Sequence, residues 1–104
     1  MEIIFQSHHA TVSQFMRDRA ERGVRKCAAR LSRAVDALVR FEADGPTRRV
    51  EIVLHAPKHQ DVRATGDAPR FAGALSTALR HLDAQTRDPK RPRRANPLKA
   101  AYSA

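Results

Sequence analysis

Hydrophobic positions change their spacing along the chain, and each spacing predicts a different element. Residues 2–6, "EIIFQ", are short, apolar and β-branched, which is typical of a strand. Over residues 12–31, apolar positions recur every three or four residues, which predicts an amphipathic helix of about five turns. Thr11 or Ser13 would cap this helix by accepting a hydrogen bond from its first turn. Gly23 lies on the apolar face, where it predicts close packing against a sheet.

Three runs with a period of two follow the first helix. They cover residues 35–43, 48–56 and 61–66, and "DGP" and "PKHQ" supply the turns between them. Short loops between alternating runs predict an antiparallel meander. The positions expected on its inner face are Val35, Ala37, Val39, Phe41, Ala43, Val50, Ile52, Leu54, Ala56, Val62 and Ala64.

A second helix is expected after residue 66. Asp67 would cap it and Pro69 would occupy its first turn. An apolar stripe follows at helical spacing, and the helix should end before Pro89. The members of the stripe are Phe71, Ala72, Leu75, Ala78, Leu79 and Leu82.

The predicted fold class is α+β, in the order β-α-β-β-β-α. We expect a four-stranded sheet with both helices packed on one face and the other face partly exposed to water. Residues 1–88 would form this domain. Residues 89–104 are rich in proline and basic residues without periodicity, and we expect them to form a disordered basic tail.

Charge narrows the classes of partner. The chain has 104 residues, with 20 Lys or Arg against 11 Asp or Glu, and a net charge of +9. Such an excess favours nucleic acid as the partner, with an anionic membrane surface as the alternative. No apolar run approaches the roughly 20 residues that a membrane span needs, and the start lacks the features of a signal peptide. We therefore expect a cytoplasmic protein, and we expect its partner to be nucleic acid and not a membrane. A single cysteine, Cys27, excludes an internal disulfide.

The first helix carries a row of basic residues beside its apolar face. At about 100° per residue the row falls within an arc of about 80° and is roughly 20 Å long. Like charges four residues apart repel each other and slightly destabilise a helix, so another role must account for the row. Binding to a line of phosphates would be such a role. A solvated face in an Arg-rich protein is the alternative interpretation. The row consists of Arg19, Arg22, Lys26, Arg30 and Arg33.

Other side chains point to binding rather than catalysis. The four Phe residues occupy expected core positions, so recognition by shape and phosphate is favoured over base stacking. Five histidines leave open a metal-dependent or acid–base enzyme, although no pair has zinc-ligand spacing. Cys27 is interpreted as a small buried residue. No phosphate loop or nucleophile elbow is present, so we expect no enzyme, cofactor, metal or small-molecule substrate.

The sequence resembles the short, single-domain form of the ribosome hibernation-promoting factors and ribosome-associated inhibitors. The similarity covers about residues 1–94. The stretches that carry it are "MEIIFQSHHATVSQFMRDRAERGVRKCAARLSR", "VDALVRFEA", "RRVEIVLHA", "DVRATGDAPRFAGALSTALRHLDAQ" and "RDPKRPRR".

This resemblance implies a fold like that of a double-stranded-RNA-binding domain. It also implies binding to rRNA of the small ribosomal subunit in the mRNA and tRNA channel, which would silence translation under stress or in stationary phase. The protein would be a monomer away from the ribosome. A general RNA-binding module, a divergent paralogue with another regulatory role, and a protein contact through the open sheet face near Val53 are the alternatives. The implied RNA-binding residues are Arg22, Lys26, Arg30 and Arg33 in the first helix and Arg80, Arg87, Lys90 and Arg91 at the second, to which the tail adds Arg93 and Arg94.

Overall fold

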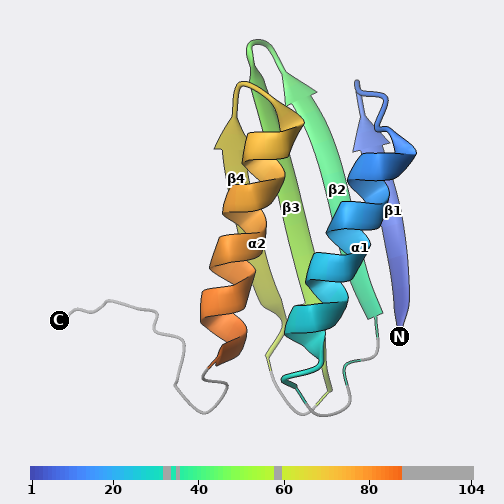
Figure 1. Cartoon of the computed structure of the whole chain (residues 1–104), viewed down its shortest axis with the longest axis vertical. Helices are drawn as coiled ribbons and strands as arrows, with labels where there is room; N and C mark the ends of the chain where they lie inside the picture. Colours follow the sequence, from blue (N-terminus) through green and yellow to red (C-terminus); the bar gives the residue numbers. More distant parts are fainter. Residues whose placement is uncertain (32–33, 35, 58–59, 88–104) are drawn as a thin grey trace, which may run out of the picture.

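A computed structural model describes residues 1–31, 34, 36–57 and 60–87 of the chain. Its elements follow the predicted order β-α-β-β-β-α, and both helices lie on the same face of one four-stranded sheet (Figure 1). The predicted disordered tail, residues 89–104, lies outside the described residues. The elements are β1 (Glu2–His8), α1 (Gln14–Ala28), β2 (Asp36–Asp44), β3 (Thr47–His55), β4 (Val62–Ala68) and α2 (Phe71–Arg87).

The sheet is mixed, with the strands in the order β1-β2-β3-β4. β1 runs parallel to β2, and α1 makes the crossover that a parallel pair requires. β2, β3 and β4 form the predicted antiparallel meander. The hairpin between β2 and β3 turns at Gly45, whose φ of 59° lies in the left-handed region that glycine adopts most easily.

The core lies between the sheet and the two helices. The predicted inner-face positions are buried, except that Ala43 is half-buried and Val35 lies outside the described residues. Phe41 is buried, and its ring meets that of Phe71 edge to face at a centroid distance of 5.5 Å. On the open face of the sheet, half-buried Val53 lies opposite Leu38.

Two residues of the predicted apolar faces are exposed, Phe15 on α1 and Ala72 on α2. Phe15 is 69% exposed, so its interpretation as a core residue was wrong. The other three Phe residues are buried or packed against the core. Position 15 is about 140° around α1 from buried Ala20 and about 180° from buried Val24, which turns its side chain away from the sheet.

The helix ends follow the predictions in part. Ser13 caps α1 as expected, because its hydroxyl accepts a hydrogen bond from the amide of Met16 at 3.2 Å. The predicted cap at Asp67 is wrong. β4 continues to Ala68, and the Asp67 carboxylate accepts a hydrogen bond from Arg49 on β3 at 2.9 Å. α2 therefore begins after Pro69, at Phe71.

Two glycines allow α2 to approach its neighbours closely. A Cβ at Gly66 of β4 would lie 2.2 Å from the carbonyl oxygen of Ala74, so the α2 backbone rests directly on the strand. Gly23 does pack closely, but its neighbour is Leu79 of α2 and not the sheet, which corrects the sequence-based expectation. Together these contacts fix α2 against both β4 and α1.

No helix in the described part of the chain has the length and hydropathy to cross a membrane.

Candidate nucleic-acid interface

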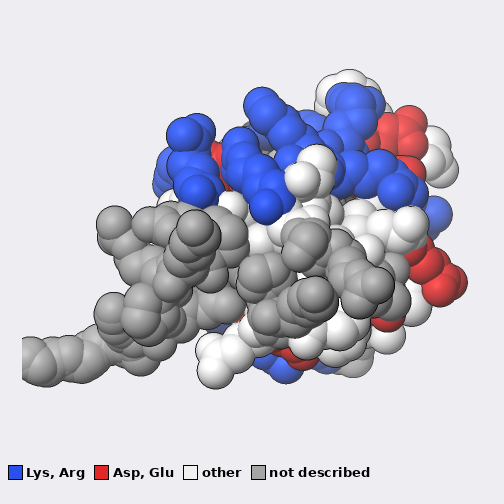
Figure 2. All heavy atoms as spheres, turned by 90° about the horizontal axis from the view of Figure 1, so that it is seen from below, with Lys and Arg blue, Asp and Glu red and all other residues white. Residues whose placement is uncertain are grey.

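A shallow groove of about 450 Å³ runs between α1 and α2 on the helical face. Gly23, Cys27 and Leu79 contribute apolar surface, and the remaining lining residues are polar or charged. Seen from below, Lys and Arg side chains gather along one edge of the molecule, on the side where the helices lie (Figure 1 and Figure 2). The polar and charged lining residues are Arg19, Lys26, Ser76, Arg80, Asp83 and Arg87.

The basic row predicted on α1 has two kinds of member. Arg22 and Lys26 are exposed and form no hydrogen bond or ion pair with any described residue. Arg19, in contrast, donates hydrogen bonds to the Ser76 hydroxyl and, at 3.3 Å, to the Ala72 carbonyl oxygen of α2. The row is therefore only partly free to bind an anion.

Arg30 is the second member of the row that reaches across to α2. Its guanidinium pairs with the Asp83 carboxylate and lies 3.3 Å from the hydroxyl of buried Thr86. The side chains of Arg30 and Asp83 are 28% and 30% exposed, so the pair is partly shielded from solvent. Arg19 and Arg30 thus hold the helices together, which accounts for part of the like-charge spacing that the sequence left unexplained.

α2 contributes one free cation and one paired cation. Arg80 is exposed and has no hydrogen-bond or ion-pair partner among the described residues, whereas Arg87 donates to Asp83 at 2.8 Å. The structure therefore brings together three unpaired cations, Arg22, Lys26 and Arg80, on the helical face. The predicted positions Arg33, Lys90, Arg91, Arg93 and Arg94 lie outside the described residues.

Asp83 is the acidic centre of the interface. Hydrogen bonds from Arg87 first, and then from Arg30, lower the pKa of its carboxyl below the usual 3.8. A lowered folded-state pKa means that the carboxylate contributes stability above pH 3.8, and that this contribution is lost as the pH falls through the lower folded-state pKa.

We therefore expect Asp83→Asn to be less stable than the parent at neutral pH and equally stable in strong acid. Urea unfolding of both proteins from about pH 7 to about pH 2 checks this, because the midpoints should converge only after Asp83 has been protonated in the parent. A difference that stays constant across this range would contradict the assigned pairing.

The remaining candidate groups do not assemble into a reactive site among the described residues. Burial raises the pKa of the Cys27 thiol, which keeps it protonated at neutral pH. His55 pairs with Asp61 at 2.6 Å, and this hydrogen bond raises the pKa of His55 above 6.5. His81 Nδ1 lies 2.8 Å from the Thr65 carbonyl oxygen. Within the described ranges, no three potential metal-ligating side chains lie together.

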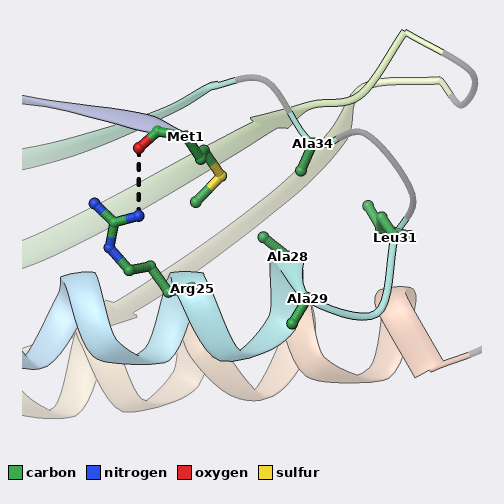
Figure 3. A pocket seen from close by; sticks show the side chains of 6 residues that line it. All are labelled: Met1, Arg25, Ala28, Ala29, Leu31 and Ala34. Carbon is green, nitrogen blue, oxygen red and sulfur yellow. Dashed lines mark hydrogen bonds between the residues drawn. The ribbon is translucent and has the colours of Figure 1, made fainter.

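A second hollow, of about 270 Å³, lies beside the C-terminal half of α1 near the start of the chain (Figure 3). Arg25, which lines it, already donates to Glu21 at 2.9 Å and to the Met1 carbonyl oxygen at 3.3 Å. The other lining residues are Met1, Ala28, Ala29, Leu31 and Ala34. This second hollow shares no residue with the basic groove.

Sequence reasoning missed one exposed residue of the helical face. On a helical projection Phe15 lies within about 20° of both Arg22 and Lys26. The same projection that found the basic row could have placed Phe15 in it. Phe15 was instead interpreted as a core residue because it is apolar.

The fold and the basic groove define a small α+β domain with a cationic helical face. Residues 3–94 match the family described as "Sigma 54 modulation protein / S30EA ribosomal protein", and the chain belongs to this family of ribosome-associated proteins. The suspected family is thereby confirmed. No curated protein sequence matches the chain significantly.

Two solved structures show the same fold. A ribosomal subunit interface protein from Coxiella burnetii is 13% identical, with a TM-score of 0.73 over 85% of this chain and 96% of its own. The N-terminal domain of Protein Y from Thermus thermophilus is 21% identical, with a TM-score of 0.71 over 83% of this chain and 96% of its own. At these identities the similarity establishes the fold alone.

Proposed function

We propose that this protein binds the small ribosomal subunit through its rRNA and silences translation by occupying the mRNA and tRNA channel. The observation that carries the proposal is the set of unpaired cations, Arg22, Lys26 and Arg80, on one helical face. Membership of a ribosome-associated family favours rRNA over an anionic membrane as the partner of this surface. The protein would act in the cytoplasm and keep idle ribosomes intact under stress or in stationary phase.

The proposed mechanism is occlusion and requires no catalytic step. Each phosphate that a Lys or Arg side chain neutralises releases condensed counterions, which drives binding. Arg19 and Arg30 fix the distance between the helices, so the free cations are held in place before RNA arrives. A bound basic domain would exclude mRNA and tRNA by its volume alone.

A general RNA-binding module is the competing function, because it would use the same cations. The two functions differ in selectivity. A ribosome-directed protein should prefer the small subunit to an arbitrary duplex of equal phosphate content. A general module should bind both equally at the same salt concentration.

Sucrose-gradient sedimentation with purified small subunits tests the proposal. We expect the protein to migrate with the subunit at low salt and to remain at the top at high salt. For three phosphate contacts, one for each unpaired cation, affinity should fall roughly fortyfold between about 50 and 200 mM salt. Protein that stays at the top of the gradient even at low salt would refute ribosome binding. Equal binding to a competitor duplex would favour the general module.

A further inference from the structure

We propose that Phe15 stacks on an unpaired nucleobase of the RNA that the basic face binds. This inference rests on the proposed RNA-binding function and adds a specific contact to it. It also revises the expectation, drawn from the sequence, that recognition involves shape and phosphate without base stacking.

Phe15 is unusually exposed for a large hydrophobic residue. Three large hydrophobic side chains in the described part of the chain are exposed, and Phe15, at 69%, is the most exposed of them. Met1, at 38%, borders the second hollow, and Ile4, at 47%, belongs to the edge strand β1. Of the three, only Phe15 lies on a helix. An aromatic ring left in water on a cationic face is available to a planar ligand.

Phe15 also lies in line with the free cations of α1. At about 1.5 Å per residue, Phe15 lies about 10 Å along α1 from Arg22 and about 16 Å from Lys26, on the same outward side. The buried residues Ala20 and Val24 face away from it. One strand of RNA could therefore place a base on Phe15 while its neighbouring phosphates meet Arg22 and Lys26.

The helical turn that carries Phe15 is capped. Phe15 lies in the first turn of α1, which the Ser13 cap holds through its bond to the Met16 amide. The first turn carries no acidic residue. Asp18, one turn on, accepts a hydrogen bond from the Gln14 amide group at 2.8 Å. The ring is thus carried by capped helical backbone, so little backbone entropy is lost when a base stacks on it.

The surroundings favour a base over a protein partner. Protein hot spots are clusters of packed apolar and aromatic residues, whereas Phe15 shares its line on α1 with Arg22 and Lys26. Aromatic residues interleaved with cations are typical of surfaces that bind single-stranded nucleic acid. A base paired within a duplex cannot offer its face to Phe15, so the preferred RNA must contain an unpaired base.

A Phe15→Trp variant gives a direct readout, because the chain contains no other tryptophan. We expect its fluorescence to be quenched when an oligoadenylate of about twelve nucleotides is added, a length similar to the stretch of single strand that one small domain covers. An abasic strand of the same length keeps every phosphate but offers no base, and it should bind without quenching. Equal quenching by both strands would overturn the stacking contact.

Affinity measurements separate this inference from the proposed function. Phe15→Ala should weaken oligoadenylate binding about tenfold, without changing the salt slope, and Phe15→Leu should not restore it. Ile4→Ala, the matched control on the sheet, should bind normally. If Phe15→Ala binds oligoadenylate normally and the double variant Arg22→Glu with Lys26→Glu does not, the stacking contact is overturned. RNA binding by the basic face would still stand. If neither substitution affects binding, RNA binding by this face is itself refuted. A tryptophan response to small subunits but not to oligoadenylate would assign Phe15 to a protein contact and overturn the inference.

Discussion

A variant carrying Arg22→Glu, Lys26→Glu and Arg80→Glu is expected to fold normally and to lose its association with the small subunit. All three side chains are exposed and unpaired among the described residues, so their replacement breaks no hydrogen bond or ion pair there. If each reversal costs about 1.4 kcal/mol of binding free energy, the three together weaken binding about a thousandfold. Co-sedimentation at a fixed low salt concentration measures the loss, and circular dichroism confirms the fold.

The matched control reverses three cations elsewhere on the molecule. Arg17 and Arg40 are exposed and unpaired among the described residues, and Arg63 makes one long contact of 3.4 Å with Glu51 that contributes little. Their reversal to Glu changes the net charge by the same amount, yet binding should fall far less. Equal losses in the two variants would mean that net charge, and not the helical face, determines binding.

Arg30 is left out of the test because of its structural role. It pairs with Asp83, so Arg30→Glu would place two carboxylates together across the helices. A loss of binding in that variant could come from a displaced α2. Substitutions confined to unpaired cations avoid this ambiguity.

Much of the fold was predictable because its determinants are local. The period-two runs around Val39 and Ile52 determine which strand faces are buried, and both residues are inaccessible in the structure. Short turns then leave few pairings other than a meander. The cap at Ser13 was likewise predictable, because its partner is only three residues away.

The partners of Arg19 and Arg30 could not be predicted, because they lie 53 to 57 residues away on α2. The sequence places both residues in the basic row but does not show which side of α1 meets α2. Asp67 fails for the same reason, since a local capping pattern competes with a cross-strand pair to Arg49. Wherever a distant partner decides between two roles, the local pattern is insufficient.

Gly66→Ala is expected to cause a large loss of stability. The added methyl would lie 2.2 Å from the Ala74 carbonyl oxygen and 2.6 Å from the Ala78 amide nitrogen. Both are backbone atoms of α2, so no side chain can rotate to make room and the helix must shift by roughly 1 Å. Overpacking of this kind costs about 3 kcal/mol, a large share of a small domain's stability. Urea denaturation should show a much lower midpoint.

Gly45→Ala is the matched control for this substitution. Gly45 has a φ of 59° and no neighbouring atom within 4 Å of an added Cβ, so alanine there introduces backbone strain without a steric clash. The expected cost is about 1 kcal/mol. Costs of equal size at the two positions would show that β4 and α2 do not pack as closely as the Gly66 contact requires.

The same substitution links packing to the interface. α2 carries Arg80. Its residues Ser76 and Asp83 accept hydrogen bonds from the guanidinium groups of Arg19 and Arg30. A shift of α2 therefore moves one free cation and loosens the hydrogen bonds through which Arg19 and Arg30 hold α1. At a temperature where Gly66→Ala remains folded, its affinity for the small subunit should fall, whereas Gly45→Ala should bind like the parent. Normal binding by folded Gly66→Ala would mean that the positions of the free cations do not depend on the contact between α2 and β4.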